Sequence, residues 1–596
     1  MIERFKKENI LYKLMTLGLI AGLVFFVARV LYGVLISADY PRELLEPSNI
    51  ALTRAFLTGK IPYTLDSLSY EVPAINYEYP FVSSLLAAGI VALSGCRIVT
   101  AHYIISTLAF LGTGVLGYLI IKPYSRTSLA PVAGAILFMM CHWRFGFISA
   151  APDDLGLFLF VLTLYISISE KISYKPLICA TLTTVCFYTK QYFVFVALGI
   201  FVYMLLYSKK EAVKFFLWTC GINIIVAVLI SLFWPLYWTY TFFFLYNGTF
   251  SGIGFGLSSL FEQMKYLSAI FIGMFGVLIG ALGWLIVKNV KSRKVETASD
   301  RAGKIETEAV NESKAEFADK NIDAEDGRQK DLARKGFIKS VLERVQANDA
   351  LSLFVIEIPV MFLPLIFFGR NDGAFLSYFL QLWMPSIIVV TLIVLEKIAG
   401  ENEKQWFALA YGIIVAFTVL FSYLKLPFHI LTKEEKAVWE EALDTVREYR
   451  QKGDVYYASE FAYLAADNGD DDIFCGHDGE VSEVSLETWN NSPLCQKLFP
   501  YADDIIKKNV DYKNNLSIKA FNAKYSLITF VEDYCLNFSG AFIDENLPFY
   551  TKIGEYTLQT GNMPYTVTFY KLKEGTTATI LYENVDEMTP GGQNGE

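Results

Sequence analysis

Histidine and cysteine are scarce in this sequence, which has four His and eight Cys among 596 residues. None of them follows the Cys-x-x-Cys or His-x-x-x-His spacing that is typical of metal sites. Five of the cysteines lie in or beside apolar segments, where a thiol packs as a small apolar side chain. The other three, Cys475, Cys495 and Cys535, lie near the C-terminus and allow one intramolecular disulfide at most. The sequence therefore gives no strong signal for a metal centre.

Charged residues are also few. Asp, Glu, Lys and Arg make up 19% of the chain, against 54% hydrophobic residues, and the mean hydropathy is +0.38. Such a chain is too apolar for a water-soluble protein and too long for a single core. The formal charge of −9 reflects acidic residues beyond residue 430 and forms no face for nucleic acid. The composition predicts an α-helical polytopic membrane protein.

Long apolar runs supply the candidate membrane spans. A helix needs about 20 apolar residues to cross the hydrocarbon of a bilayer, and twelve segments qualify as candidates. The second and the sixth are short, which predicts that they are tilted, extended by flanking residues or partly re-entrant. The candidates are 14–36, 81–95, 99–121, 129–146, 154–170, 174–189, 192–208, 214–239, 265–288, 351–368, 376–396 and 405–424.

Lysine and arginine favour cytoplasmic loops, and they predict the orientation of the chain. Arg4, Lys6, Lys7 and Lys13 lie before or at the start of the first span. They predict a cytoplasmic N-terminus that is kept as an anchor, because no small-residue cleavage site follows. Residues 39–80 are then outside. We expect four later basic clusters to share the N-terminal side: Lys122 with Arg126, Lys171 with Lys175, Lys209 with Lys210 and Lys214, and Lys288 with Lys291, Arg293 and Lys294.

Two segments differ in composition from the spans. Residues 289–350 carry charges of both signs with little apolar periodicity, which is typical of a cytoplasmic, partly disordered linker or loose helix. Residues 425–596 begin with an amphipathic helical pattern and continue with strand-like runs such as YSLITFV at 525–531. We therefore expect a transmembrane domain over 1–424 that contains the charged insert, and a small extracytoplasmic α/β domain over 425–596.

Ionisable and amide side chains gather at the predicted outer ends of the spans. Taken singly, each is typical of an interfacial ion pair or of a base that reaches into the headgroup region. Together they suggest a site, because a carboxylate near Arg or Lys in a partly dry groove can remove a proton and hold a negative charge. The set comprises Asp39, Glu43, Glu46, Asp66, Glu71 and Glu78, then Arg144, Asp153 and Asp154, then Lys190 and Gln191, then Tyr246 and Asn247, and finally Arg370, Asn371 and Asp372.

The first outer loop carries a recognisable pattern. Asp39 follows the first span by a few residues, and ALTRAFLTGKIPY (51–63) and NYEYP (76–80) precede the second. With an Asp pair at the fifth span, this pattern resembles the membrane glycosyltransferases of the GT-C superfamily, including their dolichyl-phosphate-mannose protein mannosyltransferase-like and bacterial arabinosyltransferase-like branches. The resemblance covers the architecture of residues 1–424. The superfamily often has two adjacent acids in this loop, whereas this chain has Asp39-Tyr40, so Glu46 is a rival for the same role.

The resemblance implies transfer of a sugar from a polyprenyl-phosphate donor to a glycan, lipid or protein acceptor on the outer face of the plasma membrane. Asp39, or else Glu46, would be the general base on the acceptor hydroxyl, with inversion at the anomeric carbon. Cationic side chains would hold the donor phosphate. The implied phosphate-binding residues are Lys190, Arg144 and Arg370, and the implied substrate-binding residues are Asp153, Asp154, Gln191, Asn371, Asp372, Tyr63 and Tyr79.

Several alternatives stay open at this point. Asp153 and Asp154 suit either the sugar or a divalent cation, although two adjacent acids are a weak metal signature. Tyr63 and Tyr79 suit either a substrate groove or the aromatic belt of a membrane interface. A transporter or flippase of lipid-linked sugars would also need charged groups at a membrane-embedded groove, but its site would have to be reachable from both sides. A receptor or scaffold would not need twelve spans.

Overall fold

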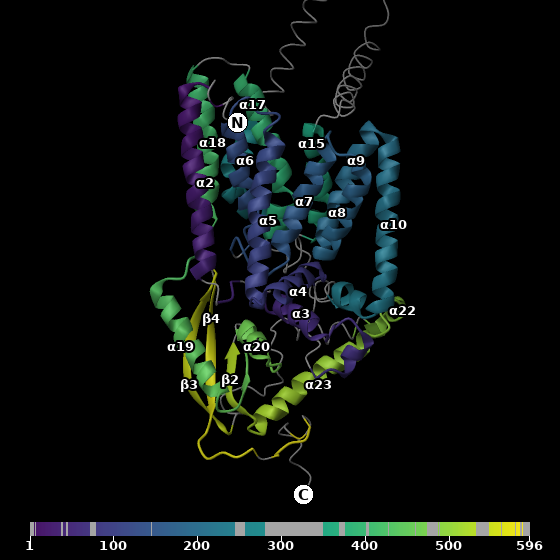
Figure 1. Ribbon diagram of the computed structural model, residues 1–596, viewed down its shortest axis with the longest axis vertical. Coiled ribbons are helices and arrows are strands. Elements are labelled where there is room, and N and C mark those ends of the chain that lie inside the picture. The colour runs from purple at the N-terminus through teal and green to yellow at the C-terminus, as the bar shows by residue number, and fades with distance from the viewer. Residues whose placement is uncertain are drawn as a thin grey trace, which may run out of the picture.

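The protein has two parts, a slab of long helices and a smaller part with a β-sheet at one face of that slab (Figure 1). The N-terminal end of the chain lies at the opposite face of the slab. The charged insert expected at 289–350 lies outside the described residues except for its last one. The computed structural model describes residues 5, 8–36, 40–42, 46–71, 79–144, 146–244, 257–280, 350–368, 376–400, 405–426, 428–458, 461–473, 487, 489–531, 548–561, 563–578, 580–584 and 587.

The long helices form where the sequence has unbroken apolar runs, because a helix satisfies its own backbone hydrogen bonds in lipid. By length and composition, four described helices can each cross a membrane: α2 (Ile10–Ile36), α5 (Ile98–Ile121), α10 (Lys209–Phe233) and α18 (Gln405–Lys425). Two pairs of helices also qualify if each bent pair is one span. They are Leu260–Ile270 with Ile272–Gly280, bent by 88°, and Leu376–Leu382 with Met384–Ala399, bent by 49°.

Shorter apolar helices pack between these spans. Glycine allows the close approach that such packing needs: a Cβ at Gly117 would lie 2.7 Å from Phe138, and one at Gly156 would lie 2.2 Å from Phe193. The elements are α6 (Leu129–Met140), α7 (Asp153–Ile168), α8 (Lys175–Thr189), η2 (Gln191–Phe195), α9 (Val196–Tyr207), η3 (Thr239–Phe244), α12 (Leu257–Ile270), α15 (Ala350–Phe368), α16 (Leu376–Leu382) and α17 (Met384–Gly400). The predicted polytopic helical fold is confirmed.

The second predicted span is wrong in its placement. It forms α4 (Val82–Ser94), whose 13 residues reach only about 20 Å. Tyr40, which follows α2, donates a hydrogen bond to Glu440 of the sheet-bearing part. Arg97, which precedes α5, pairs with Asp467 of the same part at 2.7 Å. Because the chain before α4 and the chain after it both contact that part, α4 begins and ends at one face of the slab and does not cross it.

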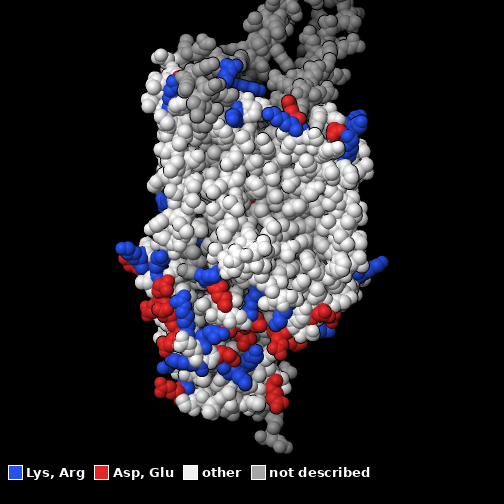
Figure 2. Space-filling model, viewed as in Figure 1, with Lys and Arg blue, Asp and Glu red and all other residues white. Residues whose placement is uncertain are grey.

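The position of α4 changes which face of the slab each later loop lies on. Twelve crossings would return the chain to the face of its N-terminus, whereas the sheet-bearing part lies opposite the N-terminus (Figure 1). Without α4, the basic clusters after α5, α7 and α9 share the N-terminal face, as the distribution of Lys and Arg requires. Figure 2 shows Lys and Arg along that rim, a broad band with few charged side chains, and dense charge of both signs over the sheet-bearing part.

The sheet-bearing part follows the predicted strand pattern. Its sheet has the order β1-β2-β4-β3, in which β1 (Asp454–Tyr456) is parallel to β2 (Tyr525–Val531) and the other pairs are antiparallel. β2 is buried along its whole length because it lies in the interior of the sheet. The other elements are β3 (Tyr550–Thr560), β4 (Met563–Leu572), α19 (Lys433–Arg450), α20 (Ala462–Asn468), α22 (Pro493–Leu498) and α23 (Ala502–Phe521).

Ion pairs and hydrogen bonds join this part to the first loop. That loop holds α3 (Glu46–Thr58) and the short 3-10 helix η1 (Leu65–Ser69). Arg54 of α3 pairs with Asp471 at 2.8 Å, and Lys508 of α23 donates a hydrogen bond to the carbonyl of Ser67 in η1. The first loop is therefore held between the slab and the sheet-bearing part.

Candidate active site

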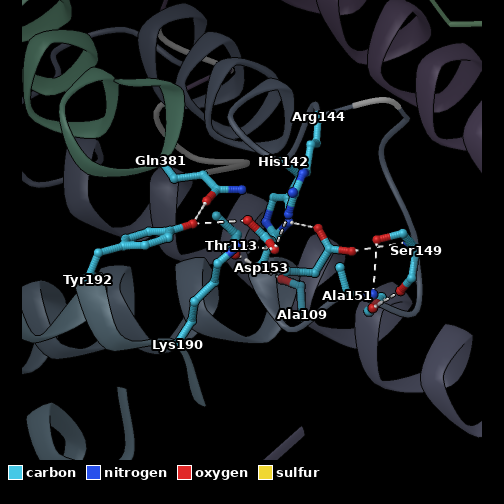
Figure 3. A network of polar contacts seen from close by, with 12 residues as sticks. Ala109, Thr113, His142, Arg144, Ser149, Ala151, Asp153, Lys190, Tyr192 and Gln381 are labelled. Carbon is cyan, nitrogen blue, oxygen red and sulfur yellow. Dashed lines mark hydrogen bonds and ion pairs between the residues drawn. The ribbon is translucent and has the colours of Figure 1, made fainter. Parts of the chain in front are cut away.

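Asp153 is the centre of a buried network of polar side chains (Figure 3). One carboxylate oxygen, Oδ2, accepts from Arg144 Nη1 at 2.8 Å and from Lys190 Nζ at 2.6 Å. The other oxygen, Oδ1, accepts from the Tyr192 hydroxyl at 2.9 Å. Asp153, Arg144 and Lys190 are each at most 5% exposed. Two cations thus share one carboxylate away from water, where charge-assisted hydrogen bonds are strong.

Three helix ends bring these residues together. Arg144 lies just past α6, Asp153 is the first residue of α7, and Lys190 follows the last residue of α8. A carboxylate at a helix N-terminus is stabilised by the unpaired N–H groups and the helix dipole. Lys190 has an extended backbone with φ −156°, which ends α8 and separates it from η2. Short connections between consecutive helices therefore place one acid and two bases at the same level of the slab.

Aromatic rings surround the ammonium group of Lys190. Its Nζ lies 4.5 Å from the ring centre of Tyr79, 5.1 Å from that of Tyr192 and 5.7 Å from that of Tyr378. The Tyr192 hydroxyl also contacts the side-chain oxygen of Gln381 in α16, so that Gln381 and Asp153 share its single proton. The faces of aromatic rings attract cations, most strongly where water is excluded. The cluster therefore draws on α16 and the first loop as well as on α6, α7 and α8.

Asp154 turns to different partners than its neighbour. Its Oδ1 lies 2.7 Å from His142 Nδ1, and its Oδ2 accepts from the backbone N–H of Ser149 at 3.4 Å. Both carboxylates of the Asp pair are thus engaged by side chains or backbone of the chain itself. Among the described residues, no group of three or more His, Cys, Asp and Glu side chains has the geometry of a metal site. The two adjacent acids therefore act as separate anchors in this geometry.

Glu46, the rival candidate for the base, is fully buried at the start of α3. Its Oε2 accepts from the backbone N–H of Arg42 at 2.6 Å, and its Oε1 accepts from the backbone N–H of Ala150 at 2.8 Å. The Tyr103 hydroxyl adds a longer contact to Oε1 at 3.4 Å. These bonds tie the first loop to the segment before α7. A carboxylate held in this way has little freedom to take a proton from a substrate.

Arg42 is a buried arginine that lies next to this carboxylate. Its guanidinium is 5.8 Å from the ring centre of Phe428, and the side chain is almost fully buried. Burial lowers the pKa of Arg42, while Tyr103, Glu46 and Asp154 act in the opposite direction. The positive charge of Arg42 therefore lies close to acids of both the first loop and α7.

The remaining predicted residues divide into three groups: some lie in or beside the cluster, Asp66 and Glu71 are exposed in the first loop, and others lie outside the described residues. Gln191 donates from Nε2 to the carbonyl of Thr241 at 2.9 Å, and the Tyr63 hydroxyl lies 3.3 Å from the carbonyl of Tyr79. The structure thus brings Tyr79, Arg144, Asp153 and Lys190 into one cluster, with Gln191 and Tyr63 beside it. Lying outside the described residues are Asp39, Glu43, Glu78, Tyr246, Asn247, Arg370, Asn371 and Asp372.

Four residues of this region were missing from the sequence prediction. His142 and Tyr192 each lie two positions from a predicted residue, so a search for polar side chains beside Arg144 and Lys190 would have found them. Arg42 lies three positions after Asp39, so the same search for polar side chains near predicted residues would have found it. Gln381 had no local signal, because its role depends on a contact between segments 189 residues apart.

Comparison with known proteins shows the fold. No protein-family model and no curated protein matches the chain. Among solved structures, the chain is similar to ArnT from Cupriavidus metallidurans bound to undecaprenyl phosphate, with a TM-score of 0.52 and 13% identity over 92% of this chain and 98% of that chain. It is also similar to the apo oligosaccharyltransferase of Archaeoglobus fulgidus, with a TM-score of 0.42 and 12% identity over 93% of this chain and 74% of that one. The likeness to ArnT shows that the two chains share one fold, the GT-C fold that the sequence predicted.

Proposed function

We propose that the protein is an integral membrane glycosyltransferase that moves a sugar from a polyprenyl-phosphate donor to an acceptor on the outer face of the membrane. The Asp153 cluster is the observation that carries this proposal. Arg144 and Lys190 share the single carboxylate of Asp153, so these three residues together carry a net positive charge. They lie at the end of the apolar slab, at the level where the phosphate of a membrane-embedded lipid would be.

The cluster suits a phosphate that leaves with a negative charge. Preorganised cations in a site without water stabilise a developing anion far more than cations in water do. Asp153 holds Arg144 and Lys190 in place before the donor arrives, so little reorganisation is needed during the reaction. The structure of ArnT mentioned above contains undecaprenyl phosphate, which supports a lipid phosphate as the ligand class. Arg370 remains a third candidate for this role from the sequence.

Asp39 is the proposed general base. The acceptor oxygen attacks the anomeric carbon while the bond from that carbon to the phosphate oxygen breaks, which inverts the carbon. The acceptor proton passes to Asp39, and the electron pair of the broken bond leaves with the phosphate. Glu46 is less suited to this role, because it already accepts from two backbone N–H groups. Gln191, Asn371, Asp372, Tyr63 and Tyr79 remain candidates for contacts to the sugar or the acceptor.

The location of the site agrees with chemistry at the outer face. The basic rim of the slab lies opposite the sheet-bearing part (Figure 2), and basic loops favour the cytoplasm. We therefore place the N-terminus in the cytoplasm and the sheet-bearing part outside, in the plasma membrane. Donor and acceptor would then meet beneath the sheet-bearing part.

A divalent cation has no assigned role in this proposal. The carboxylate oxygens of Asp153 bind Arg144, Lys190 and Tyr192, and those of Asp154 contact His142 and Ser149. Positive side chains therefore take the charge-stabilising part that a metal has in other transferases. We expect turnover to be unchanged after treatment with excess chelator. Activity that is lost with EDTA and restored by Mg²⁺ or Mn²⁺ would show that a metal is required.

The direct test uses the purified full chain in lipid vesicles with radiolabelled polyprenyl-phosphate sugars, supplied one donor at a time. We expect label to pass from one donor to an acceptor extracted from the cell envelope, and the Asp39→Asn variant to transfer it far more slowly. Failure of every donor with a folded protein, in the presence of that envelope extract, would overturn the proposal. Hydrolysis of the donor without transfer would contradict the role assigned to the acceptor.

A transporter or flippase of lipid-linked sugars is the second candidate, and one residue bears on it. Glu357 in α15 is fully buried, and neither of its carboxyl oxygens has a hydrogen-bond partner among the described residues. A Cβ at Gly199 of α9 would lie 2.2 Å from this carboxyl group. Acids inside a membrane often mark ion or substrate paths. Movement of a fluorescent lipid-linked sugar across vesicles by the wild type, lost in Glu357→Gln, would favour transport.

A further inference from the structure

The short helix α22 exposes two leucines although it belongs to the sheet-bearing part. Leu494 is 64% exposed and Leu498 is 59% exposed. Residues four positions apart lie on the same face of a helix, so the two leucines form one apolar face. Lys497 is also exposed and lies beside them. An apolar face of this kind in water would lack a partner.

The orientation of this face is set by several contacts. The Phe499 ring packs on the Phe243 ring at 5.2 Å. Trp489 Nε1 donates to the carbonyl of Phe499 at 3.0 Å, and Gln496 Nε2 donates to the carbonyl of Trp489 at 3.0 Å. The turn before α22 and the turn after it are thus tied together and to the slab. The leucines are therefore presented outward by a braced structure.

The apolar face lies where the lipid-facing surface of the slab ends. Phe243 belongs to η3, which follows α10 in the chain. Figure 1 shows α22 at the end of α10, where Leu232 and Phe233 are 72% and 70% exposed. In a membrane protein such side chains at the end of a span face lipid. The exposed apolar surface of α10 and that of α22 are therefore neighbours at the same edge of the slab.

We infer that α22 is a membrane-surface anchor, whose leucine face enters the interfacial region of the leaflet on the side of the sheet-bearing part. A short amphipathic helix that lies in the membrane plane places its apolar face at the boundary of headgroups and acyl chains. Lys497 can extend along that boundary and keep its ammonium group among the lipid phosphates. The partner is the bilayer itself, and this inference is independent of the proposed transferase activity.

The anchor would hold one end of α23. This helix begins four residues after α22 ends and runs toward the sheet, as Figure 1 shows. On the way, Lys508 donates to the carbonyl of Ser67, and its Nζ lies 5.8 Å from the ring centre of Tyr70. α23 is thus fastened to the first loop in its first half and to the bilayer through α22. Membrane contact by α22 therefore stabilises the position of the sheet-bearing part over the slab.

Tryptophan quenching by brominated lipid tests this contact. The full chain with Leu498→Trp is reconstituted in phosphatidylcholine vesicles whose acyl chains carry bromine near the headgroup, and the wild-type signal is subtracted. We expect about half of the added fluorescence to be lost, because an indole at this position would lie at the interface. Bromine near the chain ends should quench less. The variant Leu494→Trp provides a second probe on the same face.

The matched control is Ile580→Trp. Ile580 is 76% exposed and precedes Leu581, whose backbone N–H donates to Asn522 at the end of α23 that is remote from α22. We expect no quenching of this tryptophan by either lipid. Equal quenching of Leu498→Trp and Ile580→Trp, together with equal quenching of Leu494→Trp, would overturn the inference. Stronger quenching of the α22 probes from the chain ends would also overturn it, because the helix would then lie in the hydrocarbon core.

Discussion

The two ends of α6 each have a buried acid nearby, and the two acids differ in their partners. Before α6 begins, Glu396 of α17 accepts from the backbone N–H of Arg126 at 2.9 Å, from the Thr127 hydroxyl at 2.5 Å and from the Tyr411 hydroxyl at 2.7 Å. After α6 ends, Asp153 accepts from two cationic side chains and a tyrosine. The first acid holds a loop at the basic rim, and the second holds positive charge at the opposite face.

This difference separates an acid that supports the fold from an acid that organises a site. A buried carboxylate with neutral donors fixes the backbone around it, and its loss costs stability. A carboxylate with two cations keeps positive charge in place for a ligand. Clusters of interacting buried ionisable groups of this kind are typical of functional sites. Burial of an acid alone therefore does not identify a site. The charge of the groups that it binds distinguishes a site from a structural contact.

The largest effect should come from removing the proposed general base. Asp39→Asn replaces a proton acceptor by an amide that cannot take the acceptor proton. We expect turnover to fall by about 10² to 10⁴-fold, which is what a positioned general base contributes. Transfer from labelled donor measures it, and the elution profile in detergent checks that the variant folds. Full activity would remove Asp39 from the mechanism.

The next effect should come from the cation that Asp153 holds. Lys190→Ala removes one of the two charges near the donor phosphate, and we expect turnover to fall by about 10² to 10³-fold, in the range of a lost charge-stabilising donor. The matched control, Lys190→Arg, keeps the charge and should retain more activity than the alanine variant. A Lys190→Ala protein with unchanged turnover and donor affinity would remove this residue from the site.

Replacing Glu396, the acid at the other end of α6, should lower the stability of the protein and leave its turnover unchanged. Glu396→Gln weakens hydrogen bonds to a backbone N–H and two hydroxyls, and we expect the free energy of unfolding to fall by about 1–3 kcal/mol. Thermal unfolding in detergent measures the change. Turnover per folded molecule should equal that of the wild type. A selective loss of turnover with normal stability would abolish the distinction between the two ends of α6.

The smallest effect should come from the contact between α3 and the sheet-bearing part. Arg54→Ala breaks a partly exposed ion pair with Asp471, and such pairs contribute about 0.2–1 kcal/mol. The loss should shrink at high salt because ions screen exposed charges. Arg450→Ala is the control, since Arg450 pairs with Asp470 inside the sheet-bearing part. Comparing unfolding temperatures at low and high salt checks the prediction for both variants.

Much of the fold could be predicted from the sequence, because hydropathy and strand alternation are local. Each predicted span overlaps a described helix or pair of helices, and β2 lies on the predicted run 525–531. The position of α4 (Val82–Ser94) could not be predicted in this way. Its composition suits a short span, but the contacts of Tyr40 and Arg97 with residues some 400 positions away put both of its ends on one face.

The site shows the same division. The sequence by itself determined that acids, bases and aromatic residues lie at the ends of spans, because charged side chains avoid the hydrocarbon. Only the tertiary structure decided which of them meet. It joined Asp153 to Arg144 and Lys190, turned Asp154 toward His142, and engaged Glu46 with backbone donors. The physical reason is that hydropathy belongs to each segment, whereas the pairing of buried charges depends on how helix ends pack against one another.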